Sequence, residues 1–86
     1  SSIGDTKLLV MLKGFLNNLG LDDALFSDEC LIEIYDVANS SYGLNSDEPY
    51  PVKIAFEKIA NHLNRKKTLD KNSYYFYVLK KHGVVG

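Results

Sequence analysis

Hydrophobic residues recur at spacings of three and four along most of the chain, which is the period of an α-helix with one buried face. The first segment with this pattern carries its apolar positions at Leu8, Met11, Leu12, Phe15, Leu16 and Leu19. It predicts a helix near residues 6–19, with Asp5 or Thr6 as the N-cap and Gly20 as the residue that ends it. Gly14, inside this helix, marks either a close approach by a neighbouring helix or a glycine that the helix tolerates.

Two further segments show the same period. Ser27 followed by two acids is typical of a helix start, and the apolar positions behind it predict a helix near residues 28–42. Pro51 fits the first turn of a third helix, near residues 51–64, where its missing amide hydrogen is no loss. The stretch LNSDEPYPV, residues 44–52, leads into the third helix and contains both prolines of the chain and several turn-forming residues, so a loop is expected ahead of Pro51.

The stretch NSYYFYVLKKHGVVG, residues 72–86, has no clear period, and its adjacent aromatic residues have high strand propensity. Its ending LKKHG favours a helix, because basic residues suit the last helical turn and glycine suits the position after it. We therefore predict a fourth helix near residues 73–82. It would turn Tyr75 toward the core and Tyr74 and Tyr77 away from it. From the sequence alone, these tyrosines are either core or contact residues.

Together these elements predict an all-α, compact four-helix fold in which residues 1–86 form a single domain. The composition, 45% hydrophobic and 24% charged, is that of an ordinary globular protein. A chain of 86 residues buries enough surface for one core without disulfides or metals. The order of helix, basic turn and helix after residue 51 is also that of a helix-turn-helix motif.

Membrane association is not expected, because the longest apolar run, residues 8–12, is far shorter than the roughly 20 residues of a membrane span. No signal-peptide pattern is visible either. A single cysteine, Cys30, cannot form an intramolecular disulfide, which favours a reducing compartment. The expected location is therefore cytoplasmic or nuclear.

Residue patterns that carry catalysis are missing. His62 and His82 have no cysteine or acid at metal-ligand spacing beside them, and Cys30 has no neighbouring base. We therefore expect a protein that is not an enzyme, with no catalytic residue, metal, cofactor or small-molecule substrate. The histidines are interpreted as solvated or hydrogen-bonded surface residues, and Cys30 as a small buried hydrophobe.

The formal net charge of −1 hides a strong division of charge along the chain. Residues 1–50 hold nine acidic and two basic side chains, whereas residues 51–86 hold eight basic and two acidic ones. Nearly all these charges have to remain solvated. Either the two halves attract each other, or one of them meets a partner of opposite charge.

The first functional hypothesis is contact with DNA or RNA through the basic C-terminal half. Basic residues of the turn and of the last helix would hold phosphates, while a serine and two tyrosines would face bases or stack on single strands. The predicted nucleic-acid-binding residues are Arg65, Lys66, Lys67, Lys71, Ser73, Tyr74, Tyr77, Lys80 and Lys81.

The alternative is a regulatory protein–protein interaction, in the manner of an inhibitor or immunity protein that binds a basic partner. Here the acidic N-terminal half would supply the contact surface. Its predicted residues are Asp22, Asp23, Asp28, Glu29, Glu33 and Asp36. These acids are equally compatible with a solvated helix face, and Tyr35 with a core position.

Overall fold

The computed structural model describes residues 3–40 and 51–85, which contain four α-helices, one short 3-10 helix and, within those two ranges, no strand. The predicted all-α, four-helix fold is therefore confirmed. The elements are α1 (Ile3–Asn18), η1 (Asp23–Leu25), α2 (Asp28–Asn39), α3 (Pro51–Leu63) and α4 (Tyr74–Lys81).

Helix starts follow the local signals of the sequence at two of three predicted positions. The hydroxyl of Ser27 caps α2 by accepting a hydrogen bond of 3.1 Å from the amide of Cys30. Pro51 opens α3, as predicted. The start of α1 was predicted too late, because the helix already begins at Ile3 and Asp5 lies in its first turn. The positive end of the helix dipole favours a carboxylate in the first turn, even though Asp5 is not the N-cap.

Glycine ends α1 and α4 in the predicted way. Gly20 has a φ of 80° and Gly83 a φ of 77°, both in the left-handed region that glycine adopts without steric cost. The amide of Leu21 donates to the carbonyl of Leu16 over 2.9 Å, which closes the end of α1. Gly14 does not mark a close approach by a neighbouring helix. No described atom outside its own helix lies within 4 Å of the place where its Cβ would stand, so the helix tolerates it.

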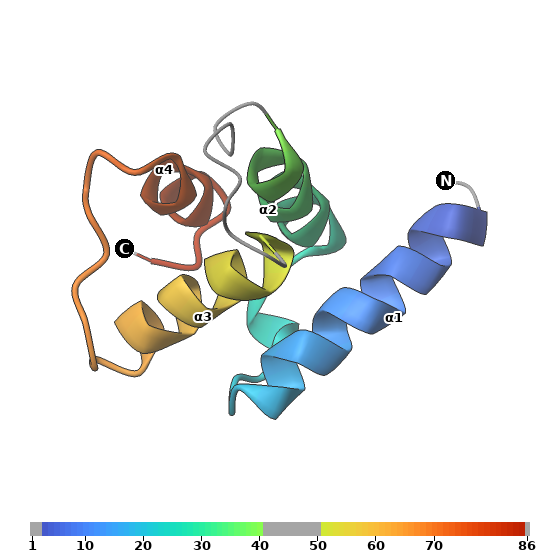
Figure 1. Cartoon of the computed structure of the whole chain (residues 1–86), viewed down its shortest axis with the longest axis horizontal. Helices are drawn as coiled ribbons and strands as arrows, with labels where there is room; N and C mark the ends of the chain where they lie inside the picture. Colours follow the sequence, from blue (N-terminus) through green and yellow to red (C-terminus); the bar gives the residue numbers. More distant parts are fainter. Residues whose placement is uncertain (1–2, 41–50, 86) are drawn as a thin grey trace.

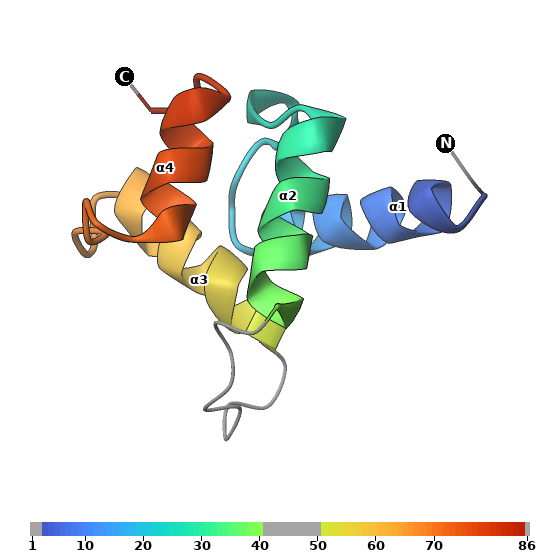
Figure 2. The same cartoon turned by 90° about the horizontal axis from the view of Figure 1, so that it is seen from above.

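The helices meet on α2. Figure 2 shows α2 and α4 side by side and antiparallel, with α3 crossing both. Both α3 and α4 pack mainly against α2. In Figure 1, α1 runs past this group with its C-terminal half and carries the N-terminus away from it. α3 and α4 follow one another in the chain, but each packs mainly against α2, so the predicted helix-turn-helix motif is not confirmed.

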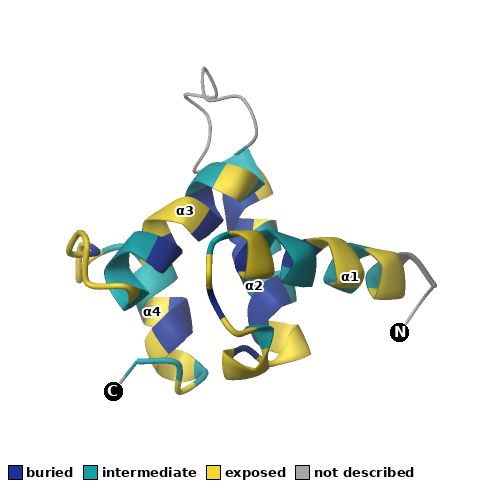
Figure 3. Ribbon diagram, turned by 90° about the horizontal axis from the view of Figure 1, so that it is seen from below, coloured by how far each residue is buried: buried dark blue, intermediate teal, exposed yellow. Residues whose placement is uncertain are grey.

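One hydrophobic core fills the space between the helices. Its largest fully buried side chains are Phe56, Leu12, Leu16, Leu31, Ile34, Ile59 and Leu79. Figure 3 shows the buried positions on the faces that the helices turn toward one another. The outer part of α1 departs from this pattern, because Val10 is 68% and Met11 44% exposed. Met11 therefore does not belong to the core stripe in which the sequence placed it. No helix in the described ranges has both the length and the apolar character that crossing a membrane requires.

Candidate functional site

Basic side chains gather at the turn between α3 and α4, where Arg65, Lys66 and Lys67 are all exposed. Two hollows flank this turn. The smaller, of about 270 Å³, is lined by His62, Arg65, Lys66, Lys67 and Thr68. The larger, of about 450 Å³, is lined by Lys58, Asn61, Lys67, Thr68, Leu69, Asp70, Ser73 and Tyr75. Lys67 and Thr68 line both hollows, so the two adjoin; we call their combined lining the basic turn surface.

Backbone geometry and one histidine hold the turn in shape. Arg65 has a φ of 61°, which places the left-handed residue one position after Asn64, the residue expected to end α3. The amides of Lys66 and Lys67 then donate to the carbonyl of Asn61 over 2.7 and 3.2 Å. This closure turns the chain sharply away from the axis of α3.

His62 connects the end of α3 with the far side of the turn. Its Nδ1 accepts a hydrogen bond of 3.1 Å from the amide of Leu69, whose side chain is only 7% exposed. Its ring also meets the edge of Phe76, with the ring centroids 5.9 Å apart. His62 thus has a structural contact that its sequence neighbourhood did not reveal, because Leu69 and Phe76 lie seven and fourteen residues further along.

The cations of the basic turn surface face solvent. Among the residues that the structure describes, Lys58, Arg65, Lys66 and Lys67 form no ion pair. Asp70 is the acidic residue of this surface, and its Oδ1 accepts from the amide of Asn72 over 2.9 Å. Positive charge therefore dominates the turn.

Lys58 and Asn61 belong to this surface, although they are not among the nucleic-acid-binding residues predicted from the sequence. A signal was available, because positions 58, 61 and 62 are three and four apart and so share one face of α3. Lys71 and Lys80 are exposed but line neither hollow, so the predicted residues are only partly brought together.

The aromatic residues of α4 divide between surface and core. Tyr74 and Tyr77 are 42% and 53% exposed, and their rings meet edge to face with centroids 5.3 Å apart. Tyr75 is partly buried against the core and lines the larger hollow. Ser73, predicted to face bases, is the N-cap of α4, and its hydroxyl accepts from the amide of Tyr75 over 3.1 Å. The predicted orientation of the tyrosines is therefore confirmed.

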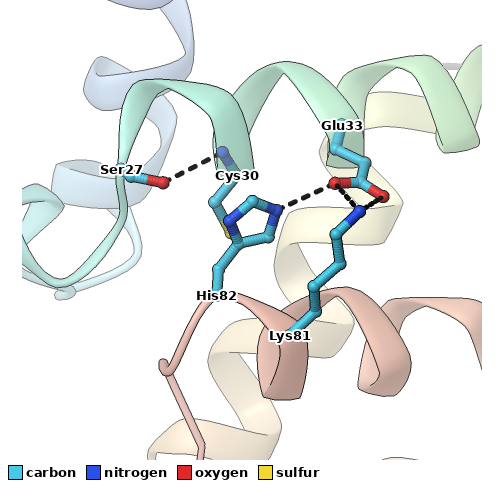
Figure 4. Close-up of polar contacts among 5 residues, drawn as sticks. All are labelled: Ser27, Cys30, Glu33, Lys81 and His82. Carbon is cyan, nitrogen blue, oxygen red and sulfur yellow. Dashed lines mark hydrogen bonds and ion pairs between the residues drawn. The ribbon is translucent and has the colours of Figure 1, made fainter.

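Lys81 lies at the opposite end of α4 from the turn and is bound to the acidic half of the chain. Figure 4 shows its ammonium group between both carboxylate oxygens of Glu33, each 3.2 Å away. His82 Nε2 lies 2.8 Å from Oε1 of the same carboxylate. The hydrogen bond to His82, and after it the one to Lys81, lowers the pKa of Glu33 against the opposing effect of burial. The hydrogen bond between Lys81 and Glu33 also raises the pKa of Lys81.

Cys30 lies next to this cluster, as Figure 4 also shows, and brings a thiol, an imidazole and a carboxylate into one region. Burial, together with the negative charge of Glu33, raises the pKa of the thiol to about 11. The thiol therefore stays protonated at neutral pH, and its side chain is fully buried. This environment is the opposite of the exposed, electropositive setting that activates a cysteine.

The predicted acidic residues are partly engaged within the chain. Asp28 lies 3.4 Å from Lys13, and Glu33 is held by Lys81. Asp22 caps η1 by accepting from the amide of Ala24 over 2.9 Å. Asp23, Glu29 and Asp36 form no ion pair with any described residue.

Fold and surface together define a small all-α domain with a basic surface at one interhelical turn. Within residues 3–40 and 51–85, no group of three or more histidine, cysteine, aspartate and glutamate side chains is arranged to hold a metal ion. Comparison of the chain with protein-family models, with curated proteins and with solved structures finds no match.

Proposed function

We propose that this chain is a non-enzymatic, regulatory binding domain that contacts DNA or RNA through the basic turn surface. The observation that carries this proposal is the gathering of Lys58, Arg65, Lys66 and Lys67 around two adjoining hollows, without an ion pair to a described carboxylate. Elsewhere in the described part, two lysines are matched by acids, at Lys13 and Lys81.

A polyanion binds most favourably to cations that are not already paired with a carboxylate. Phosphates that meet Lys and Arg release condensed counterions, and this release supplies much of the affinity of proteins for nucleic acids. A lysine already bound to a carboxylate contributes less, because the phosphate has to compete with that carboxylate. The turn residues are therefore better phosphate ligands than Lys81.

The helix-turn-helix form of the proposal places α4 in the major groove of a duplex. The exposed face of α4 would then present Tyr74, Tyr77 and Lys80 to the bases. Glu33 weakens this form, because its carboxylate lies on Lys81 and would approach the phosphates. Contact from the turn, with Lys71 at its edge, avoids that repulsion and is the form that we favour.

Salt dependence of binding tests the proposal. We expect the affinity for a labelled oligonucleotide to fall steeply between low and physiological salt. Replacing Lys66 and Lys67 by alanine together should reduce the slope of log K against log salt by about 2, since each lost phosphate contact accounts for about 1. Lys7→Ala is the matched control, because Lys7 is exposed on the part of α1 that points away from the turn (Figure 2). No detectable binding at low salt would refute the proposal.

A second candidate function is binding of a basic protein. It is favoured by one observation, the exposure of Asp22, Asp28 and Glu29 where η1 leads into α2. Charge reversal at Asp22 and Glu29 should abolish capture of such a partner by the immobilised domain, while Lys66→Ala leaves it intact. Unchanged capture by the charge-reversed variant would exclude this function.

A further inference from the structure

The larger hollow of the basic turn surface is lined by apolar, aromatic and neutral polar side chains as well as by the lysines that phosphate binding needs. We infer that it holds an unstacked base, so that the domain prefers single-stranded nucleic acid to a duplex. This inference rests on the proposed function and names the class of ligand. The larger hollow has a volume of about 450 Å³, within the range of about 300–1,000 Å³ of pockets that bind small organic groups in proteins.

The lining of the hollow suits the flat, partly apolar shape of a base. Leu69 is 7% exposed, and Tyr75 is held against the core, so both are fixed in place. An aromatic ring that is already ordered loses little conformational entropy when a base stacks on it. Stacking is also tolerant of sequence, since every base has a π-face.

Polar groups of the lining can meet the edge of a base. The side chain of Asn61, an amide with both donors and an acceptor, makes no hydrogen bond to another described residue. Asp70 uses Oδ1 for the amide of Asn72 and keeps acceptor capacity on its second oxygen. An amide and a carboxylate in the lining of one hollow match the mixed donors and acceptors of exposed base edges. A carboxylate in this position is otherwise unfavourable on a surface that binds phosphates.

The cations lie where the strand's backbone would pass. Lys58 and Lys67 line the same hollow as Tyr75, and Lys67 continues into the smaller hollow with Arg65 and Lys66. A base in the larger hollow would therefore place its own phosphate near Lys67 and the neighbouring phosphates along the turn. Bases of a duplex are paired and stacked, so they reach such a hollow only at the cost of unstacking.

Fluorescence anisotropy with matched labelled probes tests this inference: one single-stranded DNA, one single-stranded RNA of the same sequence, and the corresponding DNA duplex. We expect both single strands to bind at least about fivefold more tightly than the duplex. This ratio corresponds to the smallest binding free energy that one stacked base supplies. The RNA and DNA arms show whether the 2′-hydroxyl contributes. A nucleoside monophosphate is expected to compete only at far higher concentration.

Tyr75 supplies the variant. Tyr75→Leu should lower single-strand affinity about fivefold or more and leave duplex affinity unchanged, whereas Tyr75→Phe, which keeps the ring, should bind like the native chain. Equal binding of duplex and single strand, full single-strand affinity in Tyr75→Leu, or equally tight binding of the monophosphate would each overturn the inference. The preference of the native chain decides the matter even where Tyr75→Leu fails to fold. If no probe binds at low salt, the proposed function itself fails.

Discussion

The imidazole of His62 and the backbone of Leu69 are joined by a hydrogen bond of 3.1 Å, from the Leu69 amide to Nδ1. Together with the contact between the His62 and Phe76 rings, it links the last turn of α3 to the far side of the basic turn. Nδ1 acts as the acceptor in this bond, so a proton on the ring has to lie on Nε2. The bond is partly buried and Leu69 is 7% exposed, so losing this acceptor leaves its amide less well satisfied.

Replacing His62 by phenylalanine should therefore loosen the turn. The variant keeps a ring against Phe76 and removes the acceptor, so we expect the free energy of unfolding to fall by about 1 kcal/mol. Urea denaturation measures this loss, and faster hydrogen exchange of the Leu69 amide locates it. Asn64→Ala is the control, since Asn64 is exposed in the same turn and should change stability by less than about 0.5 kcal/mol.

Glu33 should make the protein sensitive to acid. Its pKa is lower in the folded state than in the unfolded chain, so the unfolded state binds protons first as pH falls. The stabilisation is complete above the unfolded pKa of about 4.5 and is lost as pH falls through the folded pKa.

Glu33→Gln should thus lower stability at neutral pH by about 0.5–1 kcal/mol and flatten the decline of stability below about pH 4.5. Thermal unfolding at a series of pH values measures both effects. Glu29→Gln, on the same helix and without an ion pair to described residues, should behave like the native chain. Identical acid dependence of the native chain and Glu33→Gln would contradict the assigned contact.

Gly14, inside α1, and Gly20, just after its end, should respond in opposite directions to alanine. Gly14→Ala should raise the free energy of unfolding by about 1 kcal/mol, because the space is open and alanine favours the helix. Gly20→Ala should lower it by about 1–2 kcal/mol, because φ at this position is 80°. Denaturant titration of the two variants side by side provides the measurement. A loss of stability in Gly14→Ala would mean that another element packs against this position.

Cys30 should react slowly with thiol reagents while the protein is folded. Its pKa of about 11 lies two units above the ordinary value of 9.0, so the thiolate fraction at pH 8 is about a hundredfold smaller than in the unfolded chain. Labelling with an aromatic disulfide before and after denaturation measures the ratio. As pH rises from 9.0 toward 11, the unfolded chain loses this proton first, so stability should decline over that range.

Local features of the fold were readable from the sequence. The cap at Ser27, the proline at the start of α3 and the glycine at position 83 act within one helical turn, and all three are confirmed. The fourth helix was predicted from its ending rather than from its aromatic run, and the structure confirms it. The start of α1 was predicted too late, since Asp5 is a residue type that suits both the N-cap and the first turn, and it lies in the first turn.

Contacts between distant segments were not readable. Glu33 meets Lys81 and His82 across nearly fifty residues, and the division of charge along the chain indicated only that such attraction was one possibility. The left-handed turn at Arg65 also had no signal, because asparagine at position 64 is the more usual residue for that conformation. The basic turn surface depends on this turn, which explains why its hollows could not be predicted.

Nuclear magnetic resonance titration tests the central claim most directly, since it shows where on the domain nucleic acid binds. A ¹⁵N-labelled chain would be titrated at low salt with a short oligonucleotide, both as a single strand and as a duplex. We expect the largest amide shifts in residues 58–75, led by Asn61, Lys67 and Leu69, with residues 22–36 unaffected. Shifts confined to residues 22–36, or none with either form, would contradict the account.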